Sequence, residues 1–389
     1  MKPETPCIVG IGQTVYTRWN APLESTELGL GCEAIVAAAS DAGMAVRDID
    51  GVTSFGGDGC EPAMVQAALG LTEVRLSAIL WGGGGGGSCG AVDLAAMAVM
   101  SGQAKAVVAV RSLAQGQTGR YGRYSAKRRH GSFIYPFGLL AAPQLLAMHV
   151  ARYMHEHGVT QEQLGAFALA CREHAQRNPA AVTRGRPLDM ETYLSARIIA
   201  DPLRLYDCCL ETNGACAVLV TTWERARDLG AAPVPILSSA HGSSVGWSSG
   251  PLGAFNMPLE SFATIGAASL ANDLYGRAGV KPSDIDVAQI YDNFTGLALM
   301  AMEDYGLCPR GEAGAFSASG AIQWPHGALP VNTHGGNLSE AYIHGLNHVV
   351  EGVRQMRGTS TCQVGGAELC LVTGGPGPAP TSALILGRV

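Results

Sequence analysis

Lysine is scarce in this chain, and its cysteines lack the spacing of zinc sites. Only four lysines occur in 389 residues, namely Lys2, Lys105, Lys127 and Lys281. An aldolase that works through a Schiff base needs a buried lysine as its nucleophile. Four lysines leave few candidates for that role. The eleven cysteines include no Cys-x-x-Cys motif. The sequence therefore argues against a Schiff-base enzyme, a zinc ribbon and a disulfide framework.

Long apolar segments and an excess of positive charge are also missing. No charge-free apolar run reaches the roughly 18 residues of a membrane-spanning helix. The first residues, MKPETPCIVGIGQT, lack the apolar core of a signal peptide. The net charge of −6 argues against a general nucleic-acid-binding protein. We therefore expect a cytoplasmic protein with no membrane span and no nucleic-acid partner.

Short strand-like runs alternate with longer amphipathic runs, which is typical of an α/β protein. The expected strands are residues 7–14, 51–57, 105–113, 214–222, 233–242, 284–295, 367–377 and 381–389. The expected helices are residues 23–43, 88–102, 142–158, 160–177, 261–279 and 338–358. Two similar series of elements, with an insertion in the first, suggest an internal duplication.

The most unusual segment is WGGGGGGSCG, residues 81–90, in which six glycines run into Ser88 and Cys89. Ordering each glycine in a regular element costs roughly 0.5–1 kcal/mol more than ordering alanine. Six glycines in a row therefore indicate a loop that requires residues without side chains. A phosphate loop is disfavoured because no Gly-Lys-Ser/Thr follows the run. Either Cys89 is a nucleophile at the start of a helix, or the loop has lost its nucleophile.

His344 and His348 are four residues apart on one face of the expected helix 338–358, a spacing that suits a metal ion. The sequence shows no third ligand, and the His-Glu-x-x-His motif is absent. We therefore predict no metal site and no cofactor.

Four segments in this order resemble the thiolase superfamily, within it the sterol-carrier-protein branch and the thiolase-like aldolases of steroid side-chain degradation. They are VVAVRSLAQGQTGRYG, DPLRLYDCCLETNGACAVLV, QIYDNFTG and VNTHGGNLSEAYIHG. The resemblance implies a duplicated five-layer α-β-α-β-α fold. It also implies an N-terminal half at 1–230 with an inserted loop domain at about 113–205, and a C-terminal half at 231–389.

Thiolases act through four loops, and in this chain each loop is altered. The family's nucleophilic cysteine precedes the glycine that ends its helix by about seventeen residues, and counting back from Gly102 gives Gly85. Tyr291 replaces the Asn or His of the second loop, and Tyr342 replaces the His of the third. In the fourth, Val372 replaces the acid–base cysteine. The resemblance also implies contacts to the substrate from Gly85, Asp292, Asn293, His334, Gly335, Gly374 and Gly375.

A site without either cysteine cannot form a covalent thioester, but retro-aldol chemistry remains open to it. A base would take the proton of a β-hydroxyl, and donors would stabilise the enolate that forms. We expect Tyr291 and Tyr342 to be the acid–base pair, with His344 or Glu340 as a possible relay. The rival hypotheses are a thiolase that uses Cys89 and a non-catalytic protein that binds acyl-CoA or lipid.

The resemblance further implies a CoA-thioester substrate, a homodimer and a small partner subunit with an OB fold and a zinc ribbon. The basic segment GRYGRYSAKRRH, residues 119–130, is either a solvated surface or a contact for the CoA phosphates.

Overall fold

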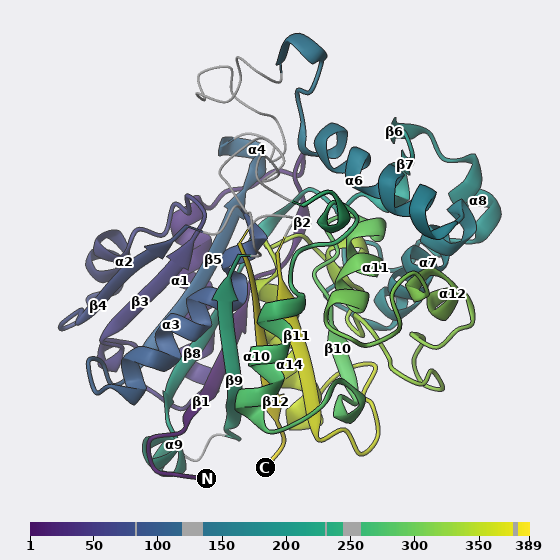
Figure 1. Ribbon diagram of the computed structural model, residues 1–389. Coiled ribbons are helices and arrows are strands. Elements are labelled where there is room, and N and C mark those ends of the chain that lie inside the picture. Colours follow the sequence, from purple (N-terminus) through teal and green to yellow (C-terminus); the bar gives the residue numbers. More distant parts are fainter. Residues whose placement is uncertain (82–83, 119–134, 230–231, 244–257, 376–379) are drawn as a thin grey trace.

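A mixed sheet runs through the molecule and joins the two halves of the chain (Figure 1). The computed structural model describes residues 1–81, 84–118, 135–229, 232–243, 258–375 and 380–389. Within these residues the strand order is β10-β11-β12-β9-β1-β8-β5-β3-β4, and β2 pairs with β8. The strands are β1 (Pro6–Gln13), β2 (Thr17–Arg18), β3 (Gly51–Phe55), β4 (Leu76–Leu80), β5 (Val107–Ala114), β8 (Thr212–Thr222), β9 (Val234–Gly242), β10 (Val287–Gln289), β11 (Leu369–Gly374) and β12 (Thr381–Gly387).

The halves of the sheet meet where β1 pairs with β9 through only two residue pairs, Cys7 with Pro235 and Ile8 with Val234. On one side of this junction β3 is parallel to both β4 and β5, and on the other β10 is parallel to β11. Because the carboxyl ends of parallel strands share one edge, each half offers a loop-bearing edge where a site can form.

Two buried helices lie between the halves and contact strands of both. They are α3 (Ser88–Met100) and α14 (Leu346–Arg357). Helix α1 (Glu27–Asp41) packs on β1, β5 and β8, whereas α10 (Ala268–Ala278) packs on β9 and β12. The five layers expected from the sequence are therefore confirmed.

Residues 142–204, which lie between β5 and β8 in the chain, form a helical lobe at the upper right of Figure 1. It contains α6 (Ala142–His157), α7 (Gln161–Arg177), α8 (Met190–Ser195) and the strand pair β6 (Ile198–Ala200) and β7 (Leu203–Arg204). Helix α7 packs against three helices of the second half, α11 (Thr295–Asp304), α12 (Ala313–Ala318) and α13 (Gly336–Ser339). The insertion thus covers the second half. The domain boundaries at 230 and at about 113–205 stay predictions, and the basic segment 119–130 lies outside the described residues.

Helix starts follow the capping residues in the sequence. Thr26 begins α1, and its hydroxyl accepts the N–H of Gly29 at 3.1 Å. Thr160 begins α7 with a capping box, in which its hydroxyl and the side chain of Gln163 bond each other's backbone N–H groups. The remaining helices are α2 (Pro62–Leu69), α4 (Gln115–Thr118) and α9 (Trp223–Leu229).

The single helix expected at 338–358 is wrong. The chain leaves the helical conformation after Ser339 and resumes it at Leu346. His344 and Gly345 have φ angles of 50° and 86°, and such left-handed backbone cannot continue a right-handed helix. His344 therefore lies in a turn before α14, and it does not share a helical face with His348.

The helix expected at 261–279 is shorter than predicted, because α10 begins only at Ala268. Sequence analysis also missed β4 and α11. None of the described helices is long and apolar enough to cross a membrane.

Candidate active site

Loops from both halves converge beside the first turn of α3. Gly85 follows β4, Tyr291 follows β10, and Gly374 ends β11. A methyl group on Gly85 would lie 2.0–2.2 Å from the ring and hydroxyl of Tyr291. A methyl group on Gly374 would lie 2.2 Å from the Ser88 hydroxyl and 2.9 Å from the Gly85 carbonyl oxygen. The position counted as that of the lost nucleophile thus lies against Tyr291 and has no room for a side chain.

The two predicted tyrosines form a hydrogen-bonded pair. The hydroxyl oxygens of Tyr291 and Tyr342 are 3.1 Å apart, and the residues are only 2% and 9% exposed. The backbone N–H of Tyr291 donates to the hydroxyl of Thr373 at 2.9 Å, and that of Tyr342 donates to Thr212 at 3.0 Å. Leu113, at the end of β5, packs with both rings. Elements of both halves therefore fix the pair.

Burial sets the protonation state of the pair. Removal from water raises the pKa of Tyr291 well above its ordinary value, and the hydrogen bond from Tyr342 offsets only part of this rise. Tyr291 is therefore a neutral phenol at physiological pH, able to donate a hydrogen bond.

His344 lies beside this pair and is held by a residue that sequence analysis missed. Its ring meets that of Tyr342 edge-on, with centroids 4.9 Å apart and planes at 85°. The Nε–H of Arg111 donates to its Nδ1 at 3.0 Å, and Arg111 also pairs with buried Asp58. Burial, together with the Arg111 charge, lowers the pKa of His344 well below its ordinary value. The signal available in the sequence was an arginine inside the apolar strand VVAVRSLA.

Cys89 does not point toward the phenols. It lies in the first turn of α3, is fully buried, and its thiol donates to the carbonyl of Val372 at 3.6 Å. Burial raises the pKa of the Cys89 thiol to about 12, even though Ser88 and Ser382 bond the sulfur. A reactive cysteine has a lowered pKa and access to its substrate, and Cys89 has neither.

Asp292, predicted to contact substrate, is engaged inside the protein. Its Oδ1 accepts the backbone N–H of Asn337 at 2.8 Å and lies 3.1 Å from His348 Nε2. The neighbouring Asn293 is also buried, and its carbonyl accepts the N–H of Cys209 at 2.9 Å. Asp292 thereby fixes the start of α13, and both contacts bind the loop of Tyr291 to adjacent elements.

His334 and Glu340 belong to a separate buried cluster behind the pair. His334 Nε2 lies 3.6 Å from Glu340 Oε2, and Glu340 accepts hydrogen bonds from Asn178 at 2.8 Å and Asn347 at 3.1 Å. Burial raises the pKa of Glu340 to about 7 and lowers that of His334. These contacts connect Glu340 to asparagines and a histidine, so the geometry offers no support for a relay from the tyrosines through Glu340.

Gly335 and Gly375 shape the ends of two site loops. Gly335 has a φ of 110° immediately before α13, and Gly375 has a φ of 144° immediately after β11. A methyl group on Gly375 would lie 2.7 Å from the Thr381 hydroxyl. Both positions require glycine for backbone reasons, and in the described structure both act on loop shape.

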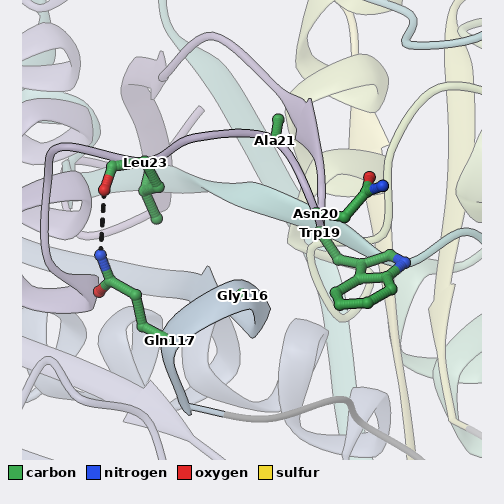
Figure 2. A pocket seen from close by; sticks show the side chains of 6 residues that line it. All are labelled: Trp19, Asn20, Ala21, Leu23, Gly116 and Gln117. Atoms are coloured by element: carbon green, nitrogen blue, oxygen red, sulfur yellow. Dashed lines mark hydrogen bonds between the residues drawn. The ribbon is translucent and has the colours of Figure 1, made fainter.

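A small cavity of about 300 Å³ opens where the chain after β2 faces α4 (Figure 2). Figure 2 shows Gln117 pointing to Leu23, whose carbonyl oxygen accepts its side-chain N–H at 3.2 Å. The backbone N–H of Gly116 donates a hydrogen bond to the side-chain oxygen of Asn213. Asn213 follows Thr212, whose hydroxyl accepts the backbone N–H of Tyr342. The cavity therefore adjoins the end of β8 that anchors the tyrosine loop. Across the described ranges, no group of three His, Cys, Asp or Glu side chains could hold a metal ion.

Comparisons with known proteins identify the family of the chain. Residues 257–388 match the family described as thiolase C-terminal domain-like. A 17-hydroxy-3-oxo-4-pregnene-20-carboxyl-CoA lyase of Mycobacterium tuberculosis is 42% identical over 98% of each chain. A steroid side-chain-cleaving aldolase of Thermomonospora curvata is 40% identical over 99% of this chain and 98% of its own.

A solved structure, described as an Ltp2-ChsH2(DUF35) aldolase, superposes with a TM-score of 0.91 at 39% identity, covering 100% of this chain and 99% of that one. The fold is thus that of the thiolases. Within that superfamily, the chain belongs to the family of thiolase-like steroid side-chain-cleaving aldolases.

Proposed function

We propose that this protein is a CoA-thioester aldolase. It cleaves the bond between the α and β carbons of a β-hydroxyacyl-CoA, giving a ketone and a shorter acyl-CoA. The names of the two relatives support a steroid side-chain intermediate as the substrate, since both proteins are named for steroid cleavage and one of them for a hydroxylated CoA thioester.

The observation that carries the proposal is the pair of phenol oxygens 3.1 Å apart, beside Gly85, which sequence analysis predicted to occupy the position of the thiolase nucleophile. A covalent acyl-enzyme needs a thiolate within reach of the substrate. Cys89 instead bonds the carbonyl of Val372 and is fully buried. The site keeps hydroxyl groups suited to moving a proton and has no nucleophile between them.

The retro-aldol reaction needs no net acid or base. One proton leaves the β-hydroxyl oxygen, the α–β carbon bond breaks as the ketone forms, and the electron pair enters the thioester enolate. One proton then adds to the α carbon, so the protein returns to its starting state. Two hydroxyls in hydrogen-bond contact, such as Tyr291 and Tyr342, suit this redistribution of a single proton.

Burial supports a division of labour within the pair. An unperturbed tyrosine costs about 3.4 kcal/mol to ionise near pH 7.5, and burial raises the pKa of Tyr291 further. We therefore assign Tyr291 the role of the neutral donor, which gives its proton to the α carbon. Tyr342, the less buried of the two, takes the proton of the substrate hydroxyl while its own proton passes to Tyr291 across their hydrogen bond, so both phenols end the cycle neutral.

Removing one phenol hydroxyl at a time tests the proposal. We expect Tyr291→Phe and Tyr342→Phe each to lower kcat at least about 100-fold, the scale of a general acid–base group. The assay follows ketone release from a hydroxylated steroid side-chain CoA thioester, and circular dichroism checks the fold. Turnover near the wild-type rate in both variants would refute the assignment.

The proposal includes a homodimer and a second subunit. Strand β4 ends the described sheet, with Ile79 and Trp81 43% and 59% exposed near its end, and Met97 and Met100 exposed on neighbouring α3. Such an apolar sheet edge is suited to pairing with another copy of the chain. The description of the Ltp2-ChsH2(DUF35) structure supports a small second subunit. Assays with and without that subunit would measure its contribution. We propose no cofactor besides the CoA of the substrate.

A further inference from the structure

Arg111 is an arginine with a fully buried side chain, held in one place by fixed acceptors. Its Nη1 donates to the carbonyl of Phe55 at 2.7 Å and lies 3.3 Å from a carboxylate oxygen of Asp58. That carboxylate in turn accepts hydrogen bonds from the hydroxyls of Ser54 at 2.8 Å and Ser112 at 2.9 Å. A buried ion pair with this many bonds has a defined geometry, and breaking it would leave an uncompensated charge.

The third contact of Arg111 decides where the proton of His344 lies. The arginine Nε–H donates to His344 Nδ1 across 3.0 Å. Because arginine keeps its proton at every physiological pH, Nδ1 must be the acceptor. A neutral imidazole then carries its single proton on Nε2.

The His344 ring stays neutral and faces the reaction site. Burial and the charge of Arg111 both disfavour the imidazolium form. Among the contacts described for the ring are Arg111 from β5, the Tyr342 ring from its own turn and the Phe55 ring at the end of β3. A methyl group on Gly84 would lie 3.9 Å from Nε2, so the protonated nitrogen faces the glycine loop next to Gly85.

We propose that Arg111 fixes His344 as a hydrogen-bond donor, whose Nε2–H stabilises the thioester oxygen as the enolate forms. This inference rests on the proposed aldolase function. His344 touches the substrate and Arg111 acts through it as a positioning residue. The histidine neither gains nor loses a proton during the cycle, so it is not the relay considered from the sequence.

Substituting His344 separates donation from proton transfer. In His344→Gln the side-chain amide N–H stands close to the position of the imidazole Nε2–H, whereas His344→Ala has no donor. Loss of such a donor lowers kcat by about 100- to 1,000-fold. We expect that loss in the alanine variant and recovery to within about tenfold of wild type in the glutamine variant. An equal loss of kcat in both variants would overturn the donor role. It would instead indicate that the histidine transfers a proton, which glutamine cannot do.

Substituting Arg111 tests the positioning role without requiring turnover. Long-range proton–nitrogen NMR on protein labelled with ¹⁵N-histidine reports which ring nitrogen is protonated, and His344→Gln identifies the resonance. We expect Nε2–H in the wild type between pH 6 and pH 8, and a mixture of tautomers in Arg111→Gln. The same variant should lose kcat by about 10- to 100-fold, with KM changed less than about threefold, because only transition-state stabilisation is removed.

Arg172→Gln is the matched control, because Arg172 is another buried arginine and bonds Ser339 rather than a histidine. It should leave the His344 tautomer as in the wild type. If Arg111→Gln fails to fold, Arg111→Lys keeps the charge opposite Asp58, and its single ammonium cannot reproduce the three contacts. Protonated Nδ1 in the wild type, or an unchanged tautomer in the Arg111 variants, would overturn the inference. Failure of the wild type to cleave the substrate would instead refute the aldolase function, and the tautomer result would stand independently.

Discussion

Gly85→Ala is expected to disable the site by displacing a phenol rather than by removing one. The added methyl group would lie 2.0 Å from Cε2, 2.1 Å from Cζ and 2.2 Å from the hydroxyl oxygen of Tyr291. Carbon atoms in contact are normally about 3.5–4.0 Å apart. The Tyr291 ring must therefore move by about 1.5 Å or more. The backbone of Gly345 also packs close to this ring, since a methyl group there would lie 2.7 Å from Cδ2.

Two effects follow from that shift, and they can be measured separately. Overpacking a buried site costs about 1–3 kcal/mol of folding free energy, which urea denaturation measures. Moving the Tyr291 hydroxyl out of the 3.1 Å bond to Tyr342 should lower kcat at least about 100-fold, because catalytic groups misplaced by 1 Å lose rates of that order. Ketone release under saturating substrate is the assay.

A control and a double variant make the result specific. A methyl group added to Gly276, on α10, would have nothing within 4 Å, and the backbone there is ordinary helix, so Gly276→Ala should gain about 0.5–1 kcal/mol of stability with unchanged kcat. In a Tyr291→Phe background, Gly85→Ala should add little further loss, because both changes remove the same hydroxyl. A Gly85→Ala protein with wild-type kcat would refute the reasoning.

Three further outcomes are expected. Cys89→Ala should keep kcat/KM within about threefold of wild type, measured at steady state, since its thiol faces Val372. The pKa of Glu340 is raised to about 7 from 4.5, so the stability that its protonated form contributes below pH 4.5 is lost as pH rises through 7. Urea denaturation at pH 5 and pH 8 should show about 2.5 kcal/mol of this loss, absent in Glu340→Gln. Trp81→Lys should shift the protein from dimer to monomer in light scattering, because it places a charge beside the exposed edge strand β4.

The residues that could be identified from the sequence are those placed by a motif or a count. Tyr291 and Tyr342 occupy fixed positions in two loop motifs, and the structure brings their hydroxyls together. Gly85 was identified by counting back along the sequence from Gly102, the glycine after α3. In the structure Gly85 lies against Tyr291. The α/β class was also accessible, because alternating strands and amphipathic helices follow from apolar periodicity. The five layers were implied by the resemblance to the thiolases.

Other features depend on tertiary contacts that leave no pattern in the sequence. Arg111 is one charged residue in an apolar strand, and nothing in the local sequence pairs it with His344, 233 positions away. The helix break at His344 was missed because apolar periodicity continues through residues 338–358, and no residue type in that run ahead of Gly345 marks the left-handed φ angle of His344. Asp292 was predicted to contact substrate, but its carboxylate instead contacts the backbone of α13 and the ring of His348.

The mass of the intact protein during turnover tests most directly whether cleavage proceeds without a covalent intermediate. The enzyme, with the proposed second subunit, would be mixed with excess hydroxyacyl-CoA substrate, quenched in acid during steady-state ketone release, and analysed by mass spectrometry. The arrangement of Gly85, Tyr291 and Cys89 predicts the unmodified mass at every time point while ketone accumulates. An acyl adduct that forms and decays at the rate of turnover, mapped to Cys89, would contradict the account.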